Sequence, residues 1–342
     1  MPTSAKLGIT AEFFTNGHLH FPAPGIELLK QYPHLEPHPL TNNLEITASQ
    51  RADCDFIVTG ATRWTKPALE GNDHLIALLM MGVGYDHIDV DALTEADVML
   101  CAAPDAVRRP MATTIMTFLL VLATRLWQKD RITREGRWLE QKSYNGDGLE
   151  GRTFGSIGVG NIGREFFKLA MPFGMRHLAC DPHVSAESVT QVGVELVDME
   201  TVLAESDYVS VSVPLSEATY HMIGEAEFRK MRPDAYFINT ARGRIVDEPA
   251  LIRALNEGWI RGAGLDVFEQ EPVDPENPLL KMDNVVVAPH SLCHTTEYLH
   301  LGWTGRVASA DTISRGGIPE AVVNKAVLDK PSFRKKLARY GD

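Results

Sequence analysis

The sequence has few cysteines, a deficit of basic residues and no long uninterrupted apolar run. Cysteine occurs only at positions 54, 101, 180 and 293 of 342 residues, and this wide spacing without a CxxC pair favours buried free thiols over disulfides. Lysine and arginine total 33 against 45 acidic residues, for a formal net charge of -12. This balance argues against nucleic acid or an anionic membrane as a partner, so an anionic small molecule would need a local basic site.

The N-terminal residues lack the apolar core of a signal peptide, and the apolar stretches are shorter than a membrane-spanning helix requires. We therefore expect a cytoplasmic protein. The length suits two domains rather than one, and the chain contains no internal repeat or low-complexity segment.

Residues 152–181 have the pattern of one complete nucleotide-binding unit. An apolar segment runs into the glycine turn GVGNIG at 158–163, apolar residues then recur at helical spacing, and a second strand at 177–180 ends at Asp181. Gly158 permits a tight turn, Gly160 lets the backbone approach a pyrophosphate, and Gly163 allows close packing of helix on strand.

The start of that helix is suited to bind phosphate. The free N–H groups of its first residues, Asn161, Ile162 and Gly163, would face the pyrophosphate. Asp181 can accept hydrogen bonds from both ribose hydroxyls and would repel a 2′-phosphate, which favours NAD over NADP. The alternative, an ordinary glycine-rich turn, is disfavoured because strand, helix and acid are all in register.

The rest of the chain alternates short apolar segments with helix-like ones, which predicts an α/β fold with two doubly wound parallel sheets. The expected strands are residues 7–9, 56–58, 75–80, 98–101, 208–213, 236–241, 262–267 and 285–288. Pro110 is expected to open a long helix that is apolar over most of its circumference.

Two further segments carry predictions. Residues 18–39 are rich in proline and histidine and are expected to be largely irregular. His18 and His20 in this segment could suggest a metal, but a solvated loop is favoured because no cysteine or carboxylate completes a ligand set. The basic residues at 330–339 are expected to form a solvated helix face.

Three predicted strands are followed by residues whose side chains could take part in a reaction: Arg242, Glu271 and His290. In an open parallel sheet the carboxyl ends of strands converge beside the ligand. Arginine binds carboxylates in a fixed geometry, and a carboxylate with a histidine suits proton transfer. Each residue alone has a structural explanation, but together they suit reduction of a 2-keto acid. The segment GVGYDHID at 82–89 follows a strand, where backbone N–H groups can hold a carboxylate.

With GVGYDHID, GVGNIG, NTARG at 239–243, GLDVFEQEP at 264–272 and PH at 289–290, the chain resembles the D-isomer-specific 2-hydroxyacid dehydrogenases over nearly its whole length. The resemblance implies that Arg242 binds the substrate's carboxylate and carbonyl, that His290 is the acid/base, and that Glu271 pairs with it. It also implies that the backbone at Val83 and Gly84 holds the carboxylate. Further cofactor contacts are implied at Pro214, Thr219, Thr240, Ala241 and Asp266.

The resemblance implies a Rossmann NAD-binding domain at 105–297, covered by a smaller flavodoxin-like substrate domain made of residues 1–104 and 298–342, and a homodimer. The chain departs from the family at Thr113, at Arg108 and Arg109, and in the run 291–294, which leaves the substrate undecided. Arg109 either contacts the distal end of the substrate or is a solvated or dimer-contact residue. Cys293 and His294 beside His290 invite a zinc interpretation, which the acid/base role of His290 disfavours.

The expected reaction is hydride transfer between NAD(H) and a 2-keto acid, with His290 as imidazolium donating a proton to the developing alkoxide. Glu271 would stabilise the charged ring, and Arg242 the negative charge on the substrate. A corepressor of the same fold, whose main role is partner recognition, is the alternative. Formate dehydrogenase is disfavoured because that enzyme has glutamine where this chain has Glu271.

Overall fold

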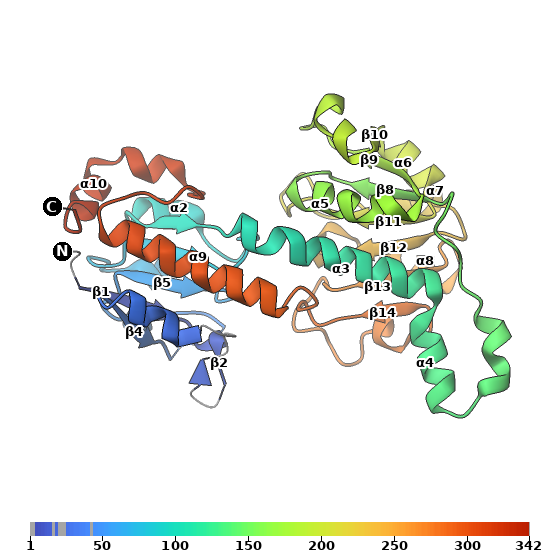
Figure 1. Ribbon diagram of the computed structural model, residues 1–342, viewed down its shortest axis with the longest axis horizontal. Coiled ribbons are helices and arrows are strands. Elements are labelled where there is room, and N and C mark those ends of the chain that lie inside the picture. The colour runs from blue at the N-terminus through green and yellow to red at the C-terminus, as the bar shows by residue number, and fades with distance from the viewer. Residues whose placement is uncertain (1–3, 16–17, 20–24, 42–43, 342) are drawn as a thin grey trace. The chain divides into compact units, whose positions relative to one another are not determined.

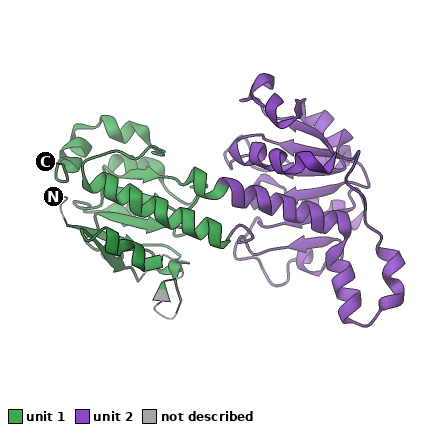
Figure 2. Ribbon diagram, in the orientation of Figure 1, with its two compact units in different colours: residues 1–107, 294–342 green, residues 108–293 purple. Residues whose placement is uncertain are grey.

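The computed structural model describes residues 4–15, 18–19, 25–41 and 44–341. The chain forms two compact units (Figure 2). Unit 1 contains Met1–Val107 and His294–Asp342, and unit 2 contains Arg108–Cys293. The chain thus leaves unit 1 once and returns to it, and both termini belong to that unit (Figure 1).

Unit 1 is built on a five-stranded parallel sheet in the order β4-β1-β5-β6-β7. Its strands are β1 (Ala5–Ile9), β4 (Leu35–Pro39), β5 (Phe56–Thr59), β6 (Ala77–Met80) and β7 (Met99–Cys101). Every residue of β5, β6 and β7 is buried, as expected for the apolar strands of a parallel sheet covered on both faces.

The α-helices described beside this sheet include α1 (Ala48–Arg51), α2 (Val90–Glu95), α9 (Thr296–Ser314) and α10 (Pro331–Leu337). The unit also contains a small hairpin, β2 (Phe14–Thr15) with β3 (His18–Leu19), and the 3-10 turns η1 (Ala11–Phe13), η2 (Gly25–Gln31), η3 (Lys66–Leu69) and η10 (Lys325–Asp329). Figure 1 shows α9 running along the sheet, so the end of the chain covers a sheet made by its beginning.

The expectation that residues 18–39 are largely irregular is wrong at Leu35–Pro39, which forms strand β4. Among the described strands this one pairs with β1 alone, at the edge of the sheet. An edge strand tolerates Pro37 and Pro39 because it needs backbone donors on one side only. His18 lies in the small hairpin, and His20 lies outside the described residues.

The basic segment 330–339 is only in part the solvated helix face that we expected: Arg334, Lys335 and Arg339 are exposed, but Lys330 and Lys336 bind backbone carbonyls of the unit. Lys330 Nζ donates to the carbonyls of Thr94 (2.6 Å) and Glu95 (3.0 Å) at the end of α2, where a helix leaves carbonyl groups without partners. Lys336 is buried and donates to the carbonyls of Leu75 and Asp97. Burial lowers the pKa of Lys336 to about 8.

Unit 2 contains a seven-stranded parallel sheet in the order β10-β9-β8-β11-β12-β13-β14. Its strands are β8 (Thr153–Ile157), β9 (Arg176–Cys180), β10 (Val194–Leu196), β11 (Tyr208–Val211), β12 (Tyr236–Asn239), β13 (Gly262–Leu265) and β14 (Val285–Val287). The strand order reverses between β8 and β11, which makes their carboxyl ends the topological switch point where such sheets bind ligands.

The α-helices that accompany this sheet are α5 (Asn161–Ala170), α6 (Met199–Glu205), α7 (Glu225–Lys230) and α8 (Glu248–Asn256). Short 3-10 turns join them: η5 (Met171–Phe173), η6 (Ala186–Ser188), η7 (Thr190–Val192), η8 (Gly243–Ile245) and η9 (Pro278–Lys281). Together the predicted α/β class and its parallel sheets are confirmed.

The long apolar helix α3 (Pro104–Thr124) begins six residues earlier than predicted. Pro104 occupies its first position, which suits proline, and Pro110 lies inside the helix. Ile115, Phe118 and Leu122 are buried in the core of unit 2. Within the described residues α3 alone has the length and apolar composition of a membrane span, but 61% of its most apolar window is buried in the structure, as in a core helix.

An arm made of α4 (Leu126–Arg134) and η4 (Trp138–Tyr144) projects from unit 2 (Figure 1). Arg131 pairs with Asp283 at its base, and the side chains of Trp127 and Gln128 donate to the carbonyl of Asp283. The arm exposes large apolar side chains, with 55% of Leu126, 65% of Trp138 and 91% of Leu139 open to solvent.

Candidate active site

The glycine turn joins β8 to α5 at the switch point of unit 2. Gly158 has φ +94°, and a Cβ there would lie 2.5 Å from the carbonyl oxygen of Ser212. A Cβ on Gly163 would lie 3.2 Å from the carbonyl oxygen of Gly158. A Cβ on Gly160 would meet no atom within 4 Å, so protein packing does not require glycine there. The open space beside Gly160 fits the pyrophosphate of a dinucleotide, next to the first N–H groups of α5.

Asp181 follows β9 and faces the glycine turn. One carboxylate oxygen accepts a hydrogen bond from the Val159 N–H at 3.0 Å, and the other accepts from the His183 N–H at 2.9 Å. Each oxygen keeps a lone pair that a ribose hydroxyl can use. Asp181 therefore holds the turn in place as well as offering acceptors to a cofactor.

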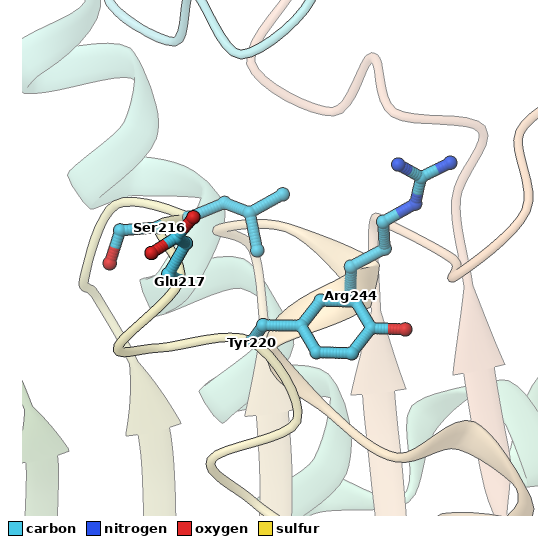
Figure 3. Close-up of a pocket in the computed structure, with 5 residues that line it drawn as sticks. Ser216, Glu217, Tyr220 and Arg244 are labelled. Carbon is cyan, nitrogen blue, oxygen red and sulfur yellow. The ribbon is translucent and has the colours of Figure 1, made fainter.

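The loop after β11 carries Pro214 and Thr219. The Thr219 hydroxyl donates to the carbonyl of Pro214 at 2.7 Å and accepts from the Ser216 N–H at 2.8 Å, which closes the loop on itself. The loop borders a pocket of about 350 Å³ at the carboxyl ends of the strands (Figure 3). Its lining residues are Leu215, Ser216, Glu217, Tyr220 and Arg244.

Arg242 stands on a turn that the buried side chain of Asn239 organises. The Asn239 amide donates to the Arg242 carbonyl at 2.9 Å, and its oxygen accepts from the Ala241 N–H at 3.0 Å. These bonds fix the backbone of Thr240 and Ala241 at the end of β12. Sequence reasoning did not single out Asn239, although an asparagine at a strand end is a signal for such side-chain-to-backbone turns.

Gly243 lets this turn approach the loop after β13. A Cβ at Gly243 would lie 1.9 Å from the carbonyl carbon and oxygen of Phe268, so no other residue fits without moving one of the two loops. The second loop leads to Glu271. This close approach brings Arg242 near enough to help lower the pKa of Glu271.

His290 and Glu271 form a pair in unit 2. His290 Nδ1 lies 2.7 Å from Glu271 Oε2, and the other Glu271 oxygen accepts from the Phe268 N–H at 3.0 Å. Burial acts to raise the pKa of Glu271, but the hydrogen bond to His290, the charge of His290, the Phe268 N–H and Arg242 outweigh it and lower the pKa. The pair therefore holds Glu271 as a carboxylate against an imidazole ring, with Nε2 of that ring left for a substrate.

The backbone around His290 rests on Asp266. The His290 N–H donates to the Asp266 carbonyl at 2.7 Å, and the Asp266 carboxylate accepts from the N–H groups of Ser291 (3.1 Å) and Leu292 (3.3 Å). Asp266 is buried, and burial raises its pKa. The structure thus places Asp266 beneath the histidine loop, and its contact with a cofactor stays a prediction.

Unit 2 contains a second histidine–glutamate pair, and its glutamate, Glu269, precedes Glu271 by two residues. His221 Nε2 is 2.9 Å from Glu269 Oε1, and Glu269 Oε2 accepts from the Glu248 N–H at 3.3 Å. This pair ties the loop after β11 to the loop after β13. Sequence reasoning missed it because nothing in the spacing of the two residues predicts their contact.

Val83 and Gly84 belong to unit 1, in the loop that joins β6 to α2. Asp89 ends this loop by accepting from the Ala92 N–H at 2.9 Å as the N-cap of α2. His87 Nε2 lies 2.9 Å from the carbonyl of Gly60, which fixes the loop to the end of β5.

Comparisons with known proteins identify the family of this chain. A family model described as the NAD-binding domain of D-isomer specific 2-hydroxyacid dehydrogenases matches residues 116–291. A glyoxylate reductase of Korarchaeum cryptofilum is 40% identical over 280 residues, which cover 81% of this chain and 84% of that protein. The chain belongs to the D-isomer specific 2-hydroxyacid dehydrogenase family.

Two further relatives show the range of this family. A D-3-phosphoglycerate dehydrogenase of Archaeoglobus fulgidus is 40% identical over 242 residues, but the match covers 71% of this chain and only 46% of that protein. A solved glyoxylate reductase structure from Paecilomyes thermophila superposes with a TM-score of 0.79 at 27% identity, covering 94% of this chain and 99% of that one.

Membership of the family establishes the chemistry. The protein is an NAD-dependent D-2-hydroxyacid dehydrogenase, which transfers a hydride between NAD(H) and a 2-keto or 2-hydroxy acid. The corepressor alternative has no support in these comparisons. All four cysteines are free, and Cys54, Cys101 and Cys293 are buried as predicted, whereas Cys180 is partly exposed.

Arg109 has a partner within unit 2. Its Nη1 lies 2.9 Å from Glu165 Oε1, on α5. This ion pair favours the structural alternative over a contact with the distal end of a substrate, and the substrate contact of Arg109 stays a prediction.

Proposed function

We propose that this enzyme reduces a small 2-keto acid such as glyoxylate with NADH, and that Arg242, Glu271 and His290 are its catalytic residues. The observation that carries the proposal is the 2.7 Å contact between His290 and Glu271, in the same unit as the turn that presents Arg242. A paired imidazole and a fixed guanidinium together supply a proton and a carboxylate anchor, which keto-acid reduction requires.

Each residue has a separate task in this proposal. Glu271 holds Nδ1 of His290, so that Nε2 carries the proton that goes to the substrate's carbonyl oxygen. The Arg242 guanidinium binds the substrate carboxylate and stabilises the negative charge that develops on that oxygen. NAD, when bound, supplies the hydride. In the oxidative direction His290 accepts the proton instead.

Cofactor contacts are proposed along the carboxyl edge of the unit 2 sheet. The glycine turn 158–163 and the first N–H groups of α5 would hold the pyrophosphate, and Asp181 the adenosine ribose, which favours NAD over NADP. The loops with Pro214 and Thr219, and with Thr240 and Ala241, lie at the ends of β11 and β12 and suit the nicotinamide half. Unit 1 would serve as the substrate domain, with the N–H groups at Val83 and Gly84 holding the carboxylate.

The test is a panel of 2-keto acids with NADH, comparing the unmodified enzyme with His290→Ala and Arg242→Ala. Each substitution should lower kcat/KM by roughly 10²- to 10⁴-fold, the usual size of general acid catalysis, while NADH still binds by fluorescence titration. His221→Ala is the matched control, because it removes the other histidine that pairs with a glutamate in unit 2. Failure of the unmodified enzyme to reduce any 2-keto acid, or full activity of His290→Ala, would contradict the proposal.

We further propose a cytoplasmic homodimer. The free thiols suit a reducing compartment. The exposed apolar side chains of the arm, above all Trp138 and Leu139, suit burial against a second copy. The test is to measure the mass of the unmodified chain and of Leu139→Glu by sedimentation. A dimer that dissociates on substitution supports the proposed homodimer. A monomeric unmodified chain contradicts it.

A further inference from the structure

Three neighbouring strands of unit 1, β1, β5 and β6, end in loops that share one edge of the sheet. Glu12, in η1 after β1, reaches across to the loop after β5. One of its carboxylate oxygens accepts from the Thr10 hydroxyl at 2.9 Å and from the Gly60 N–H, and the other accepts from the Thr62 hydroxyl at 2.7 Å. The carboxylate is therefore fixed in position although the residue is exposed to solvent.

The glycine at position 60 is necessary for this arrangement. A Cβ there would lie 2.9 Å from a Glu12 carboxylate oxygen and 3.1 Å from the ring of Phe13. The carbonyl of the same glycine contacts His87 Nε2 at 2.9 Å, in the loop that carries Val83 and Gly84. A chain of contacts within one unit thus fixes Glu12 relative to the loop that we propose for the substrate carboxylate.

Within the part of the chain that the structure describes, no cation pairs with Glu12. Its three hydrogen bonds come from neutral donors, and none of the ion pairs found among the described residues includes it. The three loops, residues 10–13, 60–63 and 81–87, contain two carboxylates, Glu12 and Asp86, and one cation, Arg63, with histidine taken as neutral. Their formal charge is therefore -1, and removing the charge of Glu12 would bring it to zero.

We propose that Glu12 is a specificity-determining residue that disfavours 2-keto acids with an anionic distal group, such as a phosphate or a second carboxylate. This inference rests on the proposed function of the same site. A fixed carboxylate repels a distal anion, whereas it tolerates a hydrogen atom and can accept a hydrogen bond from a distal hydroxyl. The substrate class is accordingly a short 2-keto acid with an uncharged substituent.

Relatives of this chain are named glyoxylate reductase and D-3-phosphoglycerate dehydrogenase. A fixed Glu12 carboxylate would distinguish the substrates of these two enzymes. The substrate of the second kind of enzyme carries a phosphate at the end distant from the carboxylate. At this edge of unit 1 such a phosphate would meet the Glu12 carboxylate, so the first kind of substrate is favoured.

The experiment compares glyoxylate with oxaloacetate and 3-phosphohydroxypyruvate in the unmodified enzyme and in Glu12→Gln. Glutamine has the same shape, its oxygen can accept from the Gly60 N–H, and its amide can donate to the Thr62 hydroxyl oxygen, so the loops keep their contacts. The ratio of kcat/KM for the anionic substrates to kcat/KM for glyoxylate should rise about tenfold, mainly through KM, because one like charge near the ligand is removed.

Glu36→Gln is the matched control. Glu36 lies in unit 1 and accepts a hydrogen bond from the Ser4 hydroxyl, but it is in β4, opposite Lys6 of β1 rather than in the loops at the carboxyl edge. This variant removes the same charge from the unit and should leave the ratio unchanged. A purely structural role for Glu12 would alter activity on all three substrates alike and would not change the ratio.

A salt series on the unmodified enzyme keeps the inference open to refutation even if Glu12→Gln does not fold. Salt screens repulsion, so the same ratio should rise with ionic strength, and it should rise less in Glu12→Gln. A ratio that neither the substitution nor salt changes would overturn the inference, as would equal use of glyoxylate and 3-phosphohydroxypyruvate by the unmodified enzyme. Absence of turnover with any 2-keto acid would instead overturn the proposed function itself.

Discussion

Replacing Glu271 with glutamine removes a charge from the proposed catalytic pair without changing its shape. The 2.7 Å contact to His290 Nδ1 is a charge-assisted hydrogen bond when the ring is protonated. Such bonds contribute about 1.5–3 kcal/mol, against about 0.5–1.5 kcal/mol for neutral ones. The side chains of His290 and Glu271 are 42% and 36% exposed, so solvent screening reduces the difference to about 1 kcal/mol.

That loss falls on the protonated form of the His290–Glu271 pair and not on its unprotonated form, so less of the protonated pair is present at a given pH in the variant. A difference of about 1 kcal/mol corresponds to about 0.7 pH units. The pH at which keto-acid reduction is half lost on the alkaline side should move down by about this amount, and the maximal rate should fall less than in His290→Ala. The assay is kcat/KM for glyoxylate reduction with NADH from about pH 5 to pH 9.

Glu269→Gln is the control for this experiment, because Glu269 is also bonded to a histidine in unit 2 but outside the proposed catalytic set. Its profile should keep the midpoint of the unmodified enzyme. An unchanged or raised midpoint in Glu271→Gln would refute the proton-transfer role of the pair.

The same substitution has a consequence for stability. The pKa of Glu271 in the folded protein lies below its ordinary value of 4.5, so its carboxylate contributes stability above that pH and loses it as the pH falls through the lowered value. The difference in free energy of unfolding between the unmodified enzyme and Glu271→Gln should therefore shrink in acid.

Three further predictions concern single positions. Asp181→Ala should narrow the difference in kcat/KM between NADH and NADPH, and it should also raise KM for NADH because the glycine turn loses an acceptor; equal use of both cofactors by the unmodified enzyme would contradict the assignment. Gly243→Ala should lower the free energy of unfolding in urea by about 1–3 kcal/mol, since its Cβ would overlap the Phe268 carbonyl; an unchanged midpoint would mean that the loops separate freely. Because the pKa of Lys336 is lowered to about 8, stability should rise with pH from about 8 to 10 relative to Lys336→Met, by up to roughly 3 kcal/mol; parallel stability curves would show that this lysine is solvated.

The sequence predicted those parts of the fold that depend on local patterns. The strands β5, β6 and β11 are short, mainly apolar segments, and each appears where it was expected because apolar residues dominate strands that are buried on both faces. Strand β8 was expected from Phe154 and Ile157 ahead of the glycine turn. The sequence also predicted the glycine turn and Asp181, because their spacing follows from the geometry of one strand, one turn and one helix.

The predictions were wrong where the structure of a segment depends on its surroundings in the folded protein. Strand β4 was missed because Pro37 and Pro39 normally end a strand, and only its place at the edge of the sheet permits them. The start of α3 was placed at Pro110 because Pro104 and Pro110 are equally good first residues. The burial of Lys336 depends on carbonyl groups more than two hundred residues away in the chain, as its contact with Leu75 shows.

The candidate site divides in the same way. Arg242, Glu271 and His290 were selected because they follow predicted strands, but the sequence could not show that Glu271 lies 2.7 Å from His290. The bonds of Asn239, the close approach at Gly243 and the position of Glu12 against Gly60 arise from packing between loops that are distant in sequence. No periodic pattern in a single sequence predicts contacts of this kind.

The prolines of β4 also limit which backbone donors this edge of the sheet presents. The Leu40 N–H, just past the end of the strand, donates inward to the Ile9 carbonyl, so by the alternation of a strand the nitrogens of residues 35, 37 and 39 point away from the sheet. Two of these nitrogens belong to Pro37 and Pro39 and carry no hydrogen, and the third, of Leu35, already donates to the Tyr32 carbonyl. Along this stretch the open edge offers no backbone donor to the strand of another molecule, and concentrated solutions or refolding mixtures cannot extend the unit 1 sheet from this side by regular strand addition.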